Sequence, residues 1–142
     1  MTTREIQGVR VLDIEVDGLP LGSERDAADL VGASYSERAL LICIPVQRLD
    51  PDFFRLRTGM AGAFIQKLIN YRRRLAVLGD ISAWISESNA FRDFVYEANK
   101  GRDVWFVADR PELESKLGAE AVELAPGTGL MDWREAPAKI GL

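Results

Sequence analysis

The stretch ALLICIPV at residues 39–46 decides the fold class, because it is apolar without a break. A strand that is solvated on one face alternates apolar and polar side chains, whereas a strand covered on both faces is apolar throughout. Residues 39–46 are therefore predicted to form a central strand of a sheet that carries helices. Pro45 indicates that the strand ends there, or lies where one backbone amide needs no partner.

Strands and helices alternate on both sides of this run. We predict core strands at residues 9–14, 75–79 and 104–107, and a short strand at 4–7. Helices are predicted after Ser23, Asp50 and Ser86 or Ser88, each of which is placed to cap a helix, and a short closing helix at 111–117. Gly59 is predicted to interrupt the second helix. This order predicts a single α/β domain, with a four- to five-stranded, mainly parallel or mixed sheet packed by four helices.

Residues 1–117 are predicted to form this domain, and residues 118–142 an irregular C-terminal tail, because glycine and proline recur through it. Within the tail, residues 121–124 are predicted to pair as a strand, and Met131 and Trp133 to dock on the domain or on a partner. The N-terminus lacks a signal-peptide hydrophobic segment, and no apolar run approaches the roughly 20 residues that span a bilayer. We expect a cytoplasmic protein that does not associate with membranes.

The composition removes the commonest catalytic and metal-binding groups. The 142 residues include no histidine, the usual general base at neutral pH and the commonest ligand of transition metals. The one cysteine, Cys43, is predicted to be a buried hydrophobic side chain. We therefore expect no catalytic residue, no metal site and no cofactor. The net charge of −4 argues against sequence-independent binding of nucleic acid, and the basic run at 71–74 is interpreted as a solvated helix end.

Several strings resemble a known family. They are DFFRLRTGMAG at 52–62, LAVLGD at 75–80, RDFVYEANKG at 92–101 and VWFV at 104–107. Together they resemble the bacterial family of the domain of unknown function 4180, from about residue 9 to residue 117. This resemblance implies no particular activity.

The order of the elements is also similar to that of STAS domains, the class that includes the anti-sigma-factor antagonists. In that class a Ser/Thr-Gly pair opens the helix after the second core strand, and Thr58-Gly59 lies at the corresponding place. The resemblance implies a STAS-like fold and a phosphorylation switch at Thr58. Arg57 stands where that class has an aspartate, so a kinase would meet a different local charge.

The start of the second helix is the first candidate site. Thr58 is either a plain helix cap or a phosphorylation site, where a phosphate would meet the free amides of a helix N-terminus. Arg55 and Arg57 would be the neighbouring cations, and Gly59 follows Thr58 directly. The same group would suit an anionic ligand.

Gly62, Gln66 and Asn70 are the second candidate, because a spacing of four residues places them in one stripe along the helix. A glycine within a helix costs about 1 kcal/mol relative to alanine, which a close contact would offset. That contact is either another helix of the same chain or a partner, including a second copy.

Asp80 and Ser82 follow the core strand at 75–79, at the edge where open α/β sheets bind ligands. One interpretation is that they cap the next helix. The other is that they form a pocket together with Arg55 and Lys67 of the second helix and its start.

Two functions of different classes follow. The leading hypothesis is a non-catalytic binding or regulatory module that acts through a protein partner or self-association, using residues 55–59 and the stripe. The alternative is a small-molecule or nucleotide-binding protein, in one version an enzyme using carboxylates, with its pocket around Asp80 and the start of the second helix. Convergence of Asp80, Ser82, Arg55 and Lys67 on one cleft would favour the alternative.

Overall fold

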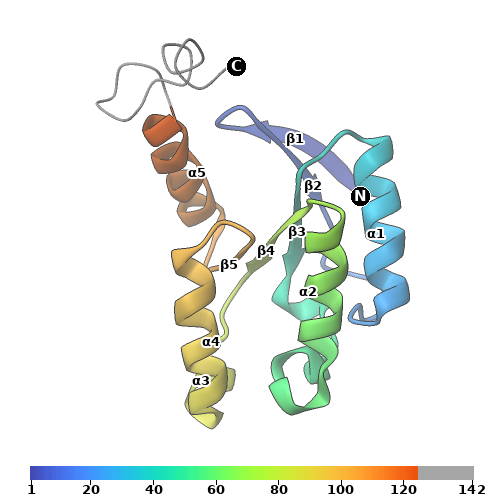
Figure 1. Cartoon of the computed structure of the whole chain (residues 1–142), viewed down its shortest axis with the longest axis vertical. Helices are drawn as coiled ribbons and strands as arrows, with labels where there is room; N and C mark the ends of the chain where they lie inside the picture. The colour runs from blue at the N-terminus through green and yellow to red at the C-terminus, as the bar shows by residue number, and fades with distance from the viewer. Residues whose placement is uncertain (125–142) are drawn as a thin grey trace, which may run out of the picture.

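The computed structural model describes residues 1–124, and these form an α/β domain with one mixed sheet. Figure 1 shows the sheet with helices beside it. The strands lie in the order β1-β2-β3-β4-β5; β1 is antiparallel to β2, and the others run parallel. Their bounds are Thr2–Ile6 for β1, Val9–Asp13 for β2, Leu41–Pro45 for β3, Arg74–Leu78 for β4 and Val104–Val107 for β5.

The described residues also contain five α-helices and three 3₁₀ turns, of which α5 follows the last strand and the others connect strands. The helices are α1 (Glu24–Ser36), α2 (Met60–Asn70), α3 (Ser82–Glu87), α4 (Asn89–Lys100) and α5 (Arg110–Leu124). The 3₁₀ turns η1 (Val46–Arg48), η2 (Pro51–Phe54) and η3 (Leu56–Thr58) fill the connection between β3 and α2. None of these helices is long and apolar enough to cross a bilayer.

The predicted helix caps are present. The Ser23 hydroxyl accepts a hydrogen bond from Asp26 N, and the Ser23 amide donates one to the Asp26 carboxylate, which completes a capping box at α1. Asp50 caps η2 through Asp52 N, and Ser88 caps α4. These short-range signals confirm where the chain turns from loop to helix.

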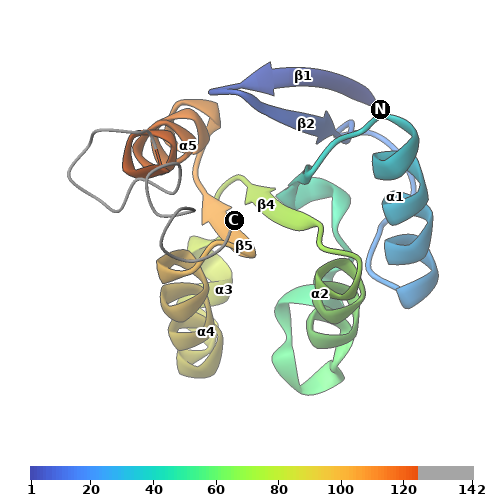
Figure 2. The same ribbon diagram turned by 45° about the horizontal axis from the view of Figure 1, so that its top comes forward.

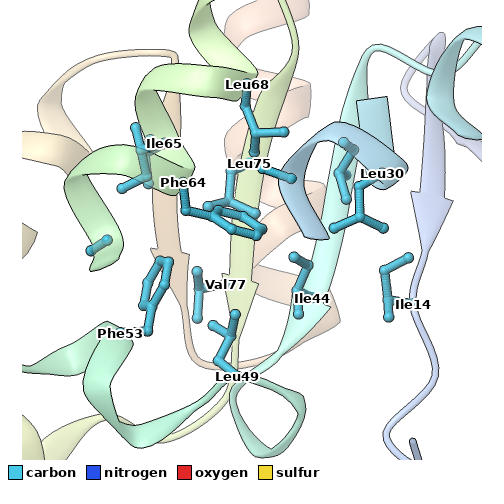
Figure 3. Packing of buried hydrophobic residues seen from close by; sticks show 14 of the residues in the cluster. Ile14, Leu30, Ile44, Leu49, Phe53, Phe64, Ile65, Leu68, Leu75 and Val77 are labelled. Carbon is cyan, nitrogen blue, oxygen red and sulfur yellow. The ribbon is translucent and has the colours of Figure 1, made fainter. Parts of the chain in front are cut away.

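The strand order fixes which face the helices cover. Each strand from β2 to β5 pairs with the next one in the sequence, and right-handed crossovers then place α1, α2 and α4 on one face. Figure 2 shows α2 and α4 on one side of β4 and β5, and α5 on the other. The larger core lies under α1, α2 and α4. There the Phe53 and Phe64 rings pack edge to face above β3 and β4, with their centroids 5.7 Å apart (Figure 3).

The opposite face of the sheet is packed by α5. Leu113 and Leu117 of this helix are fully buried against a smaller cluster that includes Cys43, Ala76 and Trp105. The sheet therefore has an apolar core on both faces, as its continuous apolar strands predicted.

The C-terminal part differs from the prediction. Residues 121–124 are the last turn of α5, so the predicted strand there is wrong. The helix passes through Gly118, where a Cβ would lie 3.4 Å from the Gln7 side chain in the β1–β2 turn. Glu120 then binds both Arg74 and Arg102. These ion pairs hold the helix beyond the glycine, while Met131, Trp133 and the rest of 125–142 lie outside the described residues.

The helix count also differs, since four helices were predicted and residues 1–124 contain five. The additional one is α3, a single short helix between Asp80 and Ser88 that has no strong apolar period in the sequence. The second helix begins later than Asp50 suggested, because η2 and η3 come first and α2 starts only at Met60. Gly59, with a φ of 78°, makes the left-handed link between η3 and α2.

Candidate functional site

A cavity of about 640 Å³ opens at the carboxyl ends of β2, β3, β4 and β5. It is larger than the hollow of about 390 Å³ beside η3. Its walls are mostly apolar and include Ile14, Pro45, Leu78 and Pro111. Open α/β sheets bind their ligands at this edge. We call this cavity the Asp13 cleft, after the most buried charged group that lines it.

Asp13 is the last residue of β2, and its side chain lies on the α5 face, beside Cys43 of β3 in the sheet register. The residue is only 8% exposed. Arg4 Nε of β1 lies 2.8 Å from Asp13 Oδ2, as an ionic contact without hydrogen-bond alignment. Arg110 Nη1 of α5 lies 3.5 Å from the same oxygen. The carboxylate thus joins three separate elements.

Burial governs the charge of this group. Loss of solvent raises the pKa of Asp13. The charge of Arg4 and a hydrogen bond from Cys43 lower this pKa by less, so the pKa lies above its ordinary value. Burial, followed by the negative charge of Asp13, raises the pKa of the Cys43 thiol to about 12. Cys43 therefore stays protonated at neutral pH, donates its S–H to Asp13, and is no nucleophile.

The rim of the cleft carries charges that have partners. Glu15 is ion-paired with the N-terminal ammonium group of Met1. Asp109 accepts a hydrogen bond from Glu112 N at 2.9 Å and so caps α5.

At the end of β4, Gly79 has a φ of 138°, and a Cβ there would lie 3.0 Å from Val46. Glycine is therefore required at this point of the wall.

The residues predicted around Thr58 lie on a different part of the surface. The Thr58 hydroxyl is 2.8 Å from the carbonyl oxygens of both Asp52 and Arg55, and it accepts a hydrogen bond from Met60 N at 3.2 Å. Thr58 and Gly59 are exposed. The hydroxyl thus holds the 3₁₀ turns together and also meets the first amide of α2.

Arg55 and Arg57 line the hollow of about 390 Å³ together with Trp84 and Glu87. Arg55 pairs with Asp52 at 3.0 Å, and its guanidinium lies 5.3 Å from the centre of the Trp84 ring. Two of the predicted cations are therefore close to each other and to Thr58.

The stripe of Gly62, Gln66 and Asn70 is exposed along α2. Gln66 Nε2 donates to Asn70 Oδ1 at 2.8 Å. A Cβ on Gly62 would meet no atom within 4 Å among the described residues. No packing within the domain therefore requires this glycine.

Asp80 and Ser82 lie at the start of α3, where Asp80 Oδ1 accepts a hydrogen bond from Ser82 N at 2.9 Å. This bond lowers the pKa of the Asp80 carboxyl, which is fully exposed. Neither residue lines the hollow beside Arg55, and neither does Lys67. The four side chains predicted for one pocket are not gathered there.

Sequence reasoning missed the Asp13 cleft. Asp13 was included in a predicted strand, and a carboxylate at the end of a core strand was the one local signal available. Its partner Arg110 is 97 residues away in the chain. No group of three or more His, Cys, Asp or Glu side chains placed to hold a metal ion occurs in residues 1–124.

A family model described as Domain of unknown function (DUF4180) matches residues 6–117. The chain belongs to the DUF4180 family. The matched range includes Asp13, Cys43 and Arg110, so most of the cleft lies within the DUF4180 domain. No curated protein and no solved structure matches the chain. The likeness to STAS domains rests on the order of the elements and on the place of Thr58-Gly59, and it stays a prediction.

The raised pKa of Asp13 predicts a pH-dependent cost to stability. Between the usual pKa of an aspartate, about 3.9, and the raised native value, the native protein binds more protons than the unfolded chain. The free energy of unfolding of the wild type should therefore fall relative to that of Asp13→Asn as the pH rises from about 4 towards 7, by about 1.4 kcal/mol per unit of pKa difference.

Urea unfolding at several pH values measures this difference. Asp93→Asn, which removes an exposed carboxylate of α4, is the matched control. If the free energy of unfolding of the wild type instead rose relative to that of Asp13→Asn over this pH range, the arginines, and not burial, would govern the pKa of the Asp13 carboxyl group.

Proposed function

We propose that this DUF4180 domain is a non-catalytic module that binds a small organic molecule in the Asp13 cleft. The observation that carries the proposal is the nine-tenths-buried carboxylate of Asp13, placed between two guanidinium groups in an apolar cavity of about 640 Å³. Ligand pockets are typically hollows of about 300–1,000 Å³ that combine apolar walls with a few placed polar groups.

The walls indicate the chemistry of the ligand. Ile14, Pro45, Leu78 and Pro111 suit an apolar body. Asp13 accepts hydrogen bonds, and Arg110, whose side chain is 47% exposed, donates them. A small molecule with an apolar frame, a hydroxyl or amino group towards Asp13 and an acceptor towards Arg110 would satisfy these groups.

Binding explains the groups of the cleft better than catalysis does. The thiol beside Asp13 is held protonated by burial, and the chain contains no histidine to act as a base. The Asp13 carboxylate is itself engaged by Arg4 and Arg110. The groups that face the cleft are therefore suited to binding a ligand, and binding needs no nucleophile–base pair.

Ligand-observed NMR with a library of small alcohols, amines and carboxylic acids tests the proposal on the full chain. We expect binders whose addition shifts the backbone amides of residues 13–16, 78–79 and 108–112. Arg110→Gln should weaken these binders by about tenfold, the scale of one charge-assisted hydrogen bond. Arg92→Gln on the exposed side of α4 is the matched control and should leave binding unchanged.

Two outcomes would count against the cleft. One is a set of binders that shift amides elsewhere in the domain. The other is equal affinity of the binders for Arg110→Gln and for the wild type.

A second candidate is a partner surface on α2, and one observation favours it: the glycine stripe faces outward with nothing of the domain on Gly62. Thr58, Arg55 and Arg57 lie at the beginning of the same helix. A phosphate on Thr58 would replace the hydroxyl contacts with Asp52 and Arg55, and would bring two negative charges beside two arginines. Such a modification would change the surface that the partner meets.

Mass spectrometry of the protein from its own cells tests this switch. We expect a phosphorylated peptide that carries Thr58, and a changed set of bound proteins for Thr58→Glu. Ser86→Glu adds the same charge to the exposed side of α3 and is the control. Unmodified Thr58, together with an identical set of partners for Thr58→Glu and the wild type, would contradict the switch.

A further inference from the structure

A second charged cavity lies at the opposite edge of the sheet from the Asp13 cleft. It measures about 490 Å³ and is formed where α2 leads into β4 and α4 leads into β5. We call it the arginine cavity, because four of its six lining residues are arginines. These residues are Ile69, Arg72, Arg73, Arg74, Arg102 and Asp103.

The arginines of this cavity outnumber the carboxylates near them. Arg74 and Arg102 share Glu120 of α5, which lies 2.9 Å from Arg74 Nη2. Among residues 1–124, Asp103 is the one acidic residue that lines the cavity. Neither Arg72 nor Arg73 has a carboxylate within 4 Å in the part of the chain that the structure describes. Four guanidinium groups against two carboxylates leave two positive charges in excess.

Arg73 is unusual because it is only 8% exposed. Its Nε donates to Ser34 Oγ at 2.9 Å, its Nη1 donates to Arg72 O at 3.3 Å, and its guanidinium lies 3.8 Å from the centre of the Tyr35 ring. All three partners are formally neutral. A buried charge is normally paired with an opposite charge, so this one adds a fixed positive potential beside the cavity.

Arg72 takes a backbone position that suits glycine. The bonds from Arg73 N to Leu68 O and from Arg72 N to Ile69 O close α2 in a Schellman motif, with Arg72 in the left-handed conformation at a φ of 56°. The helix nevertheless ends on an exposed arginine at the mouth of the cavity.

Helix α1 offers a matched comparison. It ends in the same motif, with Arg38 in the left-handed position at a φ of 57°. Arg38 is also exposed but does not line the arginine cavity. The two arginines therefore share charge, exposure and backbone conformation, and differ in their place relative to the cavity.

We propose that the arginine cavity binds the phosphate group of a small molecule, with Arg72 and Arg102 contacting its oxygens. The planar fork of arginine matches phosphate oxygens, and a phosphate monoester carries about −1.5 to −2 charges at pH 7, which balances the excess. Arg73 and Arg74 are held by α1 and α5 and supply positive potential, whereas Arg102, which also pairs with Glu120, has a side chain that is 62% exposed. This site is separate from the proposed function at the Asp13 cleft and does not depend on it.

Titration of the full chain with inorganic phosphate, at constant ionic strength in chloride, tests the site by ¹⁵N–¹H NMR. We expect saturable shifts of the amides of residues 69–74 and 102–103. Arg72→Gly should weaken binding by about tenfold or more, because it removes one guanidinium contact. Arg38→Gly should change the affinity by less than about twofold, since its charge lies outside the cavity.

Both variants should remain folded, because glycine adopts the left-handed conformation without steric cost, and a thermal unfolding midpoint at or above that of the wild type checks this. A parallel titration with glycerol 3-phosphate distinguishes the two sources of phosphate. Tighter binding of glycerol 3-phosphate than of inorganic phosphate indicates an organic phosphate as the ligand, and tighter binding of inorganic phosphate indicates the free ion. Equal affinities of Arg72→Gly and Arg38→Gly would overturn the proposal. So would shifts that fail to saturate or that appear at arginines throughout the domain.

Discussion

Right-handed crossovers between neighbouring parallel strands impose the constraint on which this domain depends. They place α1, α2 and α4 on one face of the sheet, so that the apolar residues of the other face need a different cover. That cover is α5, whose Leu113 and Leu117 are buried against the face that carries Cys43 and Trp105. Without α5, this second apolar surface would be open to water.

The position of α5 also connects the two charged cavities. The helix begins directly after β5, at the carboxyl edge, where its first residue Arg110 reaches Asp13. Ten residues later, Glu120 binds Arg74 and Arg102 at the amino edge. One helix thus places an arginine at a buried aspartate and a glutamate between two arginines. The Asp13 cleft lies at the carboxyl ends of the strands and the arginine cavity at their amino ends, and α5 contacts charged residues at both.

Local sequence signals predicted much of the fold. The apolar run at 39–46 led to β3. Ser23, Asp50 and the pair Ser86 or Ser88 marked helix starts, and Ser88 proved to be the cap of α4, because caps and continuous apolar strands act within a few residues. The extent of α5 was missed, because Gly118 indicates a helix end unless the ion pairs of Glu120 with Arg74 and Arg102 are known. The Asp13–Arg110 pair was missed for a similar reason, since it depends on the path of the whole chain. The helical period placed Gly62, Gln66 and Asn70 in one stripe, but it left open whether that stripe packs on another helix of the chain; the structure shows it exposed.

Hydrogen exchange of the α5 amides tests most directly whether this helix is the necessary cover of the second face. If it is, the amides of residues 113–120 in the full chain exchange as slowly as those of neighbouring β4 and β5, because opening the helix exposes the core beneath it. Exchange of these amides at the rate of an unstructured peptide, while β4 and β5 stay protected, would contradict it.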